Sequence, residues 1–189
     1  MKIIESDNAK AIAELHFGFV STVMGDMLTA SDACGLCFAG FVAGGDRASA
    51  LHDMMNRFPG ALFVQDPSAG VDVFAGVDAL HLAGTAFRRR VWRALLDIPS
   101  GCTVSYSQLA HAAGMPRSVR AVASAVAANP LGVVVPCHRV VRSDGRPGEY
   151  HWGAELKCRL LEAESASKRM PAGEEGRAHA SAVEICTEK

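Results

Sequence analysis

The chain is organised around one stretch, which reads Val-Val-Val-Pro-Cys-His-Arg-Val-Val-Arg from Val133 to Arg142. The apolar run before Pro136 predicts a buried strand. Pro136 lacks a backbone N–H and has a fixed φ, so the strand should end there and leave Cys137 just beyond it. Successive side chains of an extended chain point to opposite sides, so we do not expect His138 to take the Cys137 proton directly. A bridging water or a kinked backbone would have to connect the two.

The composition is that of a globular protein. The chain has 189 residues, of which 49% are apolar, and no apolar run approaches the roughly 18 residues of a membrane span. The first ten residues are polar and mixed in charge, so we expect neither a signal peptide nor a membrane partner. The six cysteines lack the spacing of a disulfide framework, which predicts a reducing, cytoplasmic setting.

The charge is divided unevenly along the chain. Residues 1–84 carry 4 basic and 10 acidic side chains, whereas residues 85–160 carry 11 basic and 4 acidic ones, and the whole chain has a net charge of −1. A positive block around Cys137 is what a phosphate-backbone ligand would need. The alternative is that these charges are scattered over a solvated surface.

The first half reads as a small module of sheet and helix. Strands are expected at residues 17–20 and 34–42, and apolar residues at helical spacing predict a helix over 47–58. No residue in this module is a candidate for catalysis, so we expect it to support the second half.

Two cysteines in this module are candidate metal ligands. Cys34-x-x-Cys37 could be half of a zinc site, with His52 or His81 as distant ligands. A single pair of this kind inside an expected strand is weak evidence, and we assign no metal.

The sequence of the second half of the chain predicts four helices. They are expected over 86–96, with Thr85 as the cap, over 107–113, over 118–128 and over 153–166. Gly114-Met115-Pro116 forms a tight turn between the second and third, which is the helix-turn-helix pattern. Residues 167–189 are small, charged and without period, so we expect them to be disordered.

The second helix of this pattern is poor in long polar side chains. It cannot address base edges in the major groove with the usual Arg, Asn or Gln contacts, whereas small residues allow a close approach to the minor groove. Arg120 is the one long cation placed to reach into a duplex. The alternative is a buried, alanine-rich core helix.

Several motifs together resemble one protein family. They are Gly-Thr-Ala-Phe-Arg-Arg-Arg-Val-Trp at 84–92, Val-Ser-Tyr-Ser-Gln-Leu-Ala at 104–110, Arg-Ala-Val-Ala-Ser-Ala at 120–125, Pro-Cys-His-Arg-Val-Val-Arg at 136–142 and Tyr-His-Trp-Gly at 150–153. This set resembles the catalytic domain of the O6-alkylguanine-DNA alkyltransferases, which includes the C-terminal half of the bacterial Ada adaptive-response protein. The resemblance implies an α+β fold. A small N-terminal sheet-and-helix domain (1–83) would precede a winged-helix-like, helix-turn-helix alkyltransferase domain (84–166).

The resemblance also assigns roles to residues. Cys137 corresponds to the alkyl acceptor, His138 and Glu164 to the partners that draw off its proton through a water, and Asn129 to the residue that holds the turn. The expected DNA-contacting residues are Ser105, Tyr106, Arg117, Arg120, Ala121 and Ser124. The expected alkyl pocket comprises Val140, Tyr150, His151 and Trp152.

The implied function is DNA repair. A methyl or other small alkyl group would pass from O6 of guanine, or O4 of thymine, in double-stranded DNA to Cys137, once per molecule. The resemblance implies no cofactor and a monomer bound through the minor groove. Position 151 is His, position 152 is Trp and position 149 is Glu where relatives carry other residues, so the breadth of alkyl groups stays open.

Two other functions remain as alternatives. A cysteine hydrolase would need a Cys–His geometry that adjacent residues do not offer, as well as an oxyanion hole. A non-catalytic DNA-binding module would use the helix-turn-helix alone, but this chain keeps the cysteine.

Overall fold

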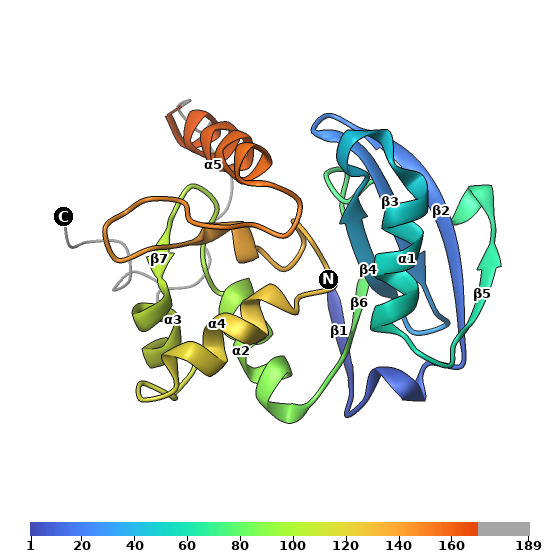
Figure 1. Ribbon diagram of the computed structural model, residues 1–189, viewed down its shortest axis with the longest axis horizontal. Helices are drawn as coiled ribbons and strands as arrows, with labels where there is room; N and C mark the ends of the chain where they lie inside the picture. The colour runs from blue at the N-terminus through green and yellow to red at the C-terminus, as the bar shows by residue number, and fades with distance from the viewer. Residues whose placement is uncertain (170–189) are drawn as a thin grey trace.

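A six-stranded mixed sheet forms one side of the protein (Figure 1). The computed structural model describes residues 1–169. The strands lie in the order β1-β6-β4-β3-β2-β5, in which β2, β3 and β4 are antiparallel neighbours and the other pairings are parallel. Their bounds are Lys2–Ser6 (β1), Glu14–Thr22 (β2), Gly25–Ser31 (β3), Leu36–Phe41 (β4), Leu62–Gln65 (β5) and Ala79–Ala83 (β6).

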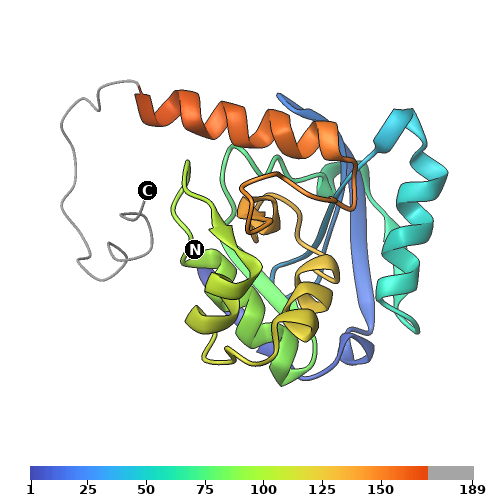
Figure 2. The ribbon, with the colours of Figure 1, turned by 60° about the vertical axis from the view of Figure 1, so that its left-hand side comes forward.

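Both faces of the sheet are covered. Side chains alternate along each strand, so neighbouring residues pack into cores on opposite faces. Met27 and Ala39 pack towards the later helices, whereas their neighbours Leu28 and Phe38 pack towards helix α1 (Arg47–Arg57). Figure 2 shows α1 and the later helices on opposite sides of the sheet. Short 3-10 turns complete this half at Ala9–Ala11, Ala43–Gly45 and Pro67–Ala69.

The second half is a group of helices around a larger core. The helices are α2 (Ala86–Leu96), α3 (Tyr106–Ala112), α4 (Val119–Ala127) and α5 (Ala154–Arg169). A short parallel pair joins β7 (Val104–Ser105) to β8 (Val140–Val141). Thr85 caps α2 as predicted, and Ser105 caps α3 in a reciprocal capping box with Gln108.

The predicted strand before Pro136 is wrong. Residues 133–135 form tight turns instead, closed by hydrogen bonds from the Val134 amide to Gly132 and from the Cys137 amide to Val135, each 2.8 Å. Val133 has φ of +69°, a strained conformation for a β-branched residue. Three valines favour a strand by residue type, but the local turn chemistry described below prevails over that preference.

The end of the chain also differs from expectation. Helix α5 continues to Arg169, so residues 167–169 are helical and the prediction of disorder fails there. The remainder of the predicted disordered tail lies outside the described residues. None of the helices within residues 1–169 combines the length and apolar character needed to cross a membrane.

The two halves are joined by backbone hydrogen bonds. The Ala39 amide of β4 donates to the Pro130 carbonyl (2.9 Å), and the Gly132 amide donates back to the Ala39 carbonyl (2.8 Å). Residue 131 therefore bridges to β4 like a short added strand. The turn that carries Cys137 thus begins directly on the N-terminal sheet.

Trp92 anchors α4 in the larger core. Its side chain is 2% exposed, and its Nε1 donates a 2.9 Å hydrogen bond to the Ala125 carbonyl in the last turn of α4. Carbonyls in a helix's last turn have no intrahelical partner, so the indole satisfies a group that is otherwise buried without one.

Trp92→Phe should therefore destabilise the fold beyond the loss of packing. Leaving the Ala125 carbonyl unsatisfied costs about 2 kcal/mol of unfolding free energy. Chemical denaturation of the variant checks this value. The matched control is Phe74→Leu at a 37% exposed position, and an equal loss in both variants would contradict the role of the indole N–H.

Candidate active site

Cys137 begins a single 3-10 turn (Cys137–Arg139) directly after Pro136. Pro136 has φ of −80° and ψ of 63°, so the backbone reverses sharply just before the cysteine. The thiol is only 7% exposed, and burial raises its pKa. A hydrogen bond from Asn129 and the positive charge of Lys157 act in the opposite direction and favour the thiolate.

The Asn129 carboxamide holds this turn from inside. Its Nδ2 lies within hydrogen-bond distance of the Val135 carbonyl (2.9 Å), the Leu131 carbonyl (3.3 Å) and the Cys137 sulfur (3.2 Å). Its Oδ1 accepts from the Leu131 amide at 3.0 Å. Asn129 is 2% exposed, so one side chain both closes the turn and contacts the sulfur.

A cavity of about 410 Å³ gives access to the sulfur. It is lined by Tyr106, Ala123, Val126, Ala127, Asn129, Cys137, Glu149, Tyr150, His151 and Trp152. Of the predicted pocket residues, Tyr150, His151 and Trp152 line it. Val140 does not, because it lies fully buried in β8.

Two tyrosines adjoin the sulfur. Burial raises the pKa of Tyr106, and the nearby Cys137 and Glu149 raise it further. Burial raises the pKa of Tyr150 well above its usual value, and again the Cys137 charge adds to the effect. The Tyr150 hydroxyl is buried, and within residues 1–169 the group that it interacts with is the Cys137 sulfur, an interaction that favours the thiolate.

His138 and Glu164 form a pair in which the histidine is fully buried and the carboxylate partly so. His138 is fully buried, and its Nε2 lies 3.0 Å from Oε1 of Glu164 on α5. A carboxylate favours the tautomer with hydrogen on Nε2, which leaves the lone pair on Nδ1. Nδ1 is buried and has no protein partner among residues 1–169, so it is available to accept a proton.

Arg139 completes this ion cluster. Its Nε and Nη2 donate to the Glu164 carboxylate at 3.0 and 2.7 Å. Burial alone would raise the pKa of Glu164, but hydrogen bonds from His138, Arg139 and the Gly101 amide outweigh it and lower the pKa to about 2. Glu164 therefore stays ionised at neutral pH.

The comparisons with known proteins agree with this geometry. A family model described as the 6-O-methylguanine DNA methyltransferase DNA-binding domain matches residues 86–166. The inducible methylated-DNA–protein-cysteine methyltransferase of Bacillus subtilis is 39% identical over 127 residues, which are 60% of this chain and 71% of that protein. The crystal structure of the Mycobacterium tuberculosis O6-methylguanine methyltransferase matches with a TM-score of 0.68 at 31% identity, over 84% of this chain and 96% of that one.

The chain belongs to the O6-methylguanine DNA methyltransferase family. The predicted family resemblance is therefore confirmed. The Escherichia coli bifunctional transcriptional activator/DNA repair enzyme Ada is 38% identical over 166 residues, which cover 82% of this chain. The chain spans about half the length of that relative, 46% of it. The predicted mixture of a sheet and helices agrees with the structures of the family.

Four of the six predicted DNA-contacting residues lie on one exposed surface, and the other two, Ser105 and Tyr106, are partly buried. Arg117, Arg120, Ala121 and Ser124 are exposed on or just before α4, while Ala123 and Ala127 of the same helix line the Cys137 cavity. The α4 surface is therefore continuous with the cavity mouth. Ser105 is half-buried, and its hydroxyl already accepts from the Gln108 amide as the cap of α3.

The residues that the structure brings together as possible metal ligands differ from those named for the zinc site in the sequence analysis. Cys34 is exposed and does not join Cys37, and His52 lies elsewhere, against a cavity under α1. Within residues 1–169, ligand atoms of Asp32, Cys37 and His81 lie within 4.8 Å of one another and could hold a metal ion. His81 and Asp32 already bind each other at 2.6 Å, and burial raises the pKa of Cys37, so the group is also a satisfied hydrogen-bond cluster without metal.

Lys157 is the residue that sequence reasoning missed. It is 1% exposed on α5, and its Nζ donates a 2.7 Å hydrogen bond to the Val140 carbonyl. Burial lowers its pKa, and the negative charge of Cys137 acts against that effect. A lysine in a helix of mixed polar and apolar residues ordinarily faces solvent. The one sequence signal for its burial is the spacing of three residues to Leu160, which places the two side chains on the same face of the helix.

Glu164→Gln should reduce the dependence of stability on acid. Because the folded pKa of Glu164 lies below its usual value of 4.5, its stabilising contribution is complete above that pH and is lost as the pH falls towards about 2. The free energy of unfolding of the wild type should therefore fall more steeply than that of Glu164→Gln between these pH values. Glu162→Gln, an exposed neighbour, is the control. Parallel curves for Glu164→Gln and the wild type would contradict the assignment.

Proposed function

We propose that this protein removes methyl or other small alkyl groups from O6 of guanine in double-stranded DNA by transferring them to Cys137. The observation that carries the proposal is the Cys137 sulfur in a cavity that opens beside the exposed surface of α4. Relatives are named methylated-DNA–protein-cysteine methyltransferases, and the Mycobacterium tuberculosis OGT has a crystal structure in complex with DNA, which matches this chain with a TM-score of 0.60 at 32% identity.

The depth of the sulfur requires the base to leave the helix. O6 of guanine is stacked and paired inside a duplex, whereas Cys137 is 7% exposed. A flipped guanine would enter the cavity lined by Tyr106 and Tyr150, while Arg120 fills the space left in the stack. The small side chains Ala121 and Ser124 on the exposed side of α4 suit a close approach to the minor groove.

The chemical step is a direct transfer. The thiol proton passes through a water to Nδ1 of His138, whose charge Glu164 stabilises. The thiolate sulfur bonds to the methyl carbon, the bond between that carbon and O6 breaks, and the electron pair returns to guanine, which takes up one proton. The thioether product has no good leaving group, so each molecule acts once. The proposal needs no cofactor.

Several finer points belong to the same proposal. We assign support to residues 1–83 and alkyl transfer to residues 84–166, with α3 and α4 as a winged-helix-like helix-turn-helix. Arg117 and Ser105 would contact the DNA backbone. The protein would act as a monomer, and because a thiol acceptor must remain reduced, its natural setting would be the cytoplasm.

Cys137→Ser should abolish transfer while leaving DNA binding intact, because a hydroxyl is scarcely ionised at neutral pH and the change is nearly isosteric. The measurement is the loss of O6-methylguanine from a duplex at known protein concentration. The wild type should repair one base per molecule. Cys158→Ser, at a half-buried thiol on α5, is the control and should retain transfer. Repair well beyond one base per molecule would contradict the proposal and favour a hydrolase.

Arg120→Ala should impair repair of duplex DNA more than transfer from free O6-methylguanine. A side chain that replaces a flipped base matters only where there is a stack, and unstacking costs a few kcal/mol, so the duplex rate should fall at least about tenfold. Single-turnover rates on both substrates make the comparison, with the exposed Arg47→Ala as the control. Equal losses on both substrates would make Arg120 a structural residue.

A further inference from the structure

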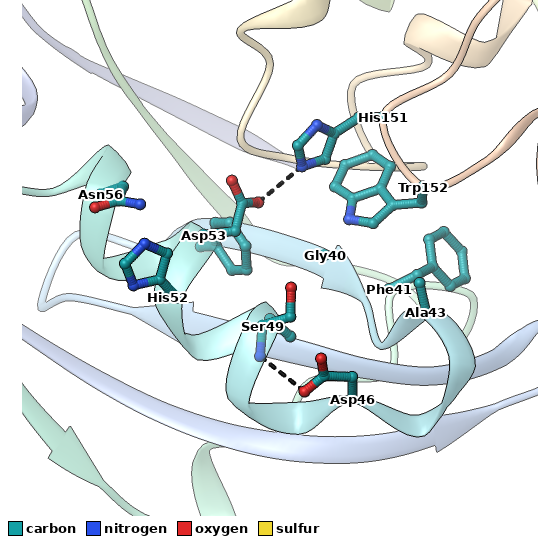
Figure 3. Close-up of a pocket in the computed structure, with 12 residues that line it drawn as sticks. Gly40, Phe41, Ala43, Asp46, Ser49, His52, Asp53, Asn56, His151 and Trp152 are labelled. Carbon is teal, nitrogen blue, oxygen red and sulfur yellow. Dashed lines mark hydrogen bonds and ion pairs between the residues drawn. The ribbon is translucent and has the colours of Figure 1, made fainter.

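A second cavity of about 360 Å³ lies between α1 and the segment that carries His151 and Trp152 (Figure 3). His151 and Trp152 line this cavity and also the one that holds Cys137. We call these two residues the dividing wall. The Trp152 indole packs tightly on Gly132, where even an added Cβ would come within 2.7 Å of the ring.

Helix α1 holds the dividing wall through a carboxylate bridge. Oδ2 of Asp53 lies 3.0 Å from Nε2 of His151, and Oδ1 accepts a 3.0 Å hydrogen bond from Nε of Arg57. In Figure 3 the Asp53 carboxylate points from α1 to the His151 ring, and Trp152 lies directly beside that ring. The rings of His151 and Trp152 meet edge to face, with centroids 5.0 Å apart.

The same helix also holds a second segment that lines the Cys137 cavity. Nη1 of Arg57 lies within hydrogen-bond distance of the Ala128 carbonyl (3.1 Å) and the Asn129 carbonyl (3.3 Å) at the end of α4. A cation is favourable at that end of a helix. Asn129 is the residue whose carboxamide contacts the Cys137 sulfur.

The Arg57–Asp53 pair is partly buried, whereas the His151 side chain that it holds is 42% exposed. The Arg57 side chain is 16% exposed and that of Asp53 is 26% exposed. Burial would raise the pKa of Asp53, but the hydrogen bond from His151 and the charge of Arg57 lower it overall, so the carboxylate is ionised. Arg57 thereby ties two segments far apart in the sequence to one helix.

We propose that Asp53 and Arg57 are positioning residues for alkyl transfer, which hold the dividing wall and the Asn129 backbone, two parts of the lining of the Cys137 cavity. This inference rests on the function proposed above and extends it, because it gives the N-terminal helix a direct part in the geometry of the reaction. Without the bridge, the wall can shift into the cavity under α1, and the incoming base is no longer aligned with the sulfur. Misalignment of this kind lowers the rate of transfer rather than the affinity for DNA.

The first test needs no DNA. The chain has two tryptophans, and Trp92 is 2% exposed in the core, so acrylamide quenching of fluorescence reports mainly on Trp152. Asp53→Asn and Arg57→Met should increase the quenching constant. Arg47→Met, on the same helix but at a 60% exposed side chain whose ion pair with Asp26 spans 3.9 Å, should leave it unchanged.

The second test measures transfer of a methyl group from duplex DNA under single-turnover conditions. The limiting rate of Arg57→Met should fall about tenfold, while the half-saturating DNA concentration stays that of the wild type. Arg57→Lys should not restore the rate, because one ammonium group cannot reach Asp53 and both carbonyls at once. Asp53→Asn and His151→Gln should have overlapping effects, so the double variant should be no slower than the slower single variant.

The outcomes separate this inference from the proposed function. If the wild type transfers no methyl group, the proposed function fails, and the quenching result still decides whether α1 holds the wall. Asp53→Asn is nearly isosteric, and thermal unfolding shows whether it is folded at the assay temperature. A folded Asp53→Asn or Arg57→Met protein with unchanged limiting rate would overturn the inference, as would a change in DNA affinity alone.

Discussion

The arrangement around Cys137 depends on the hydrogen bonds of one buried carboxamide. Asn129 satisfies the backbone of residues 131 and 135 and donates to the sulfur from the same nitrogen. Within residues 1–169 the Leu131 amide has the Asn129 oxygen as its partner, and leaving that amide buried and unsatisfied would cost about 1–3 kcal/mol. The Leu131 and Val135 carbonyls also accept hydrogen bonds from the Val135 and Cys137 amides, so the carboxamide adds a second bond to each. The carboxamide therefore makes it possible to bury a strained turn, with Val133 at positive φ, in the middle of the protein. The position of the thiol follows from that turn.

Burial creates a chemical problem that the surrounding residues offset. It raises the pKa of Cys137, which disfavours the thiolate that any transfer requires. The Asn129 hydrogen bond and the charge of Lys157 favour the thiolate from one side. On the other side, Glu164 is held ionised by Arg139 and sets the tautomer of His138. The sulfur and the imidazole are both buried, so the proton transfer between them takes place away from bulk solvent.

The sequence predicted the elements whose signals are local. Thr85 caps α2 where expected, and α1, α2 and α4 lie within a few residues of their predicted bounds. The pairing of residues 138 and 164 came from the family resemblance, since no periodicity links a 3-10 turn to a helix 26 residues later. The capping and periodicity signals, in contrast to this pairing, can be read within a short window of the chain.

The sequence could not predict features that join distant segments. The valines before Pro136 favour a strand by type, but a side chain four residues upstream of Val133 fixes them as turns. His151 meets Asp53 across 98 positions, and Arg57 meets Ala128 across 71. Lys157 reads as a surface lysine until the fold places it against the Val140 carbonyl. In each case tertiary packing, rather than residue type, determines the contact.

The central claim is that the Cys137 sulfur is the acceptor of the alkyl group. The most direct test is peptide mass spectrometry of the full chain after incubation with a duplex that contains one O6-methylguanine. The account predicts a mass increase of one CH2 unit on the peptide that contains Cys137, in stoichiometric yield and on no other cysteine peptide. An unmodified Cys137 peptide together with repaired DNA, or the added mass on another cysteine, would contradict it.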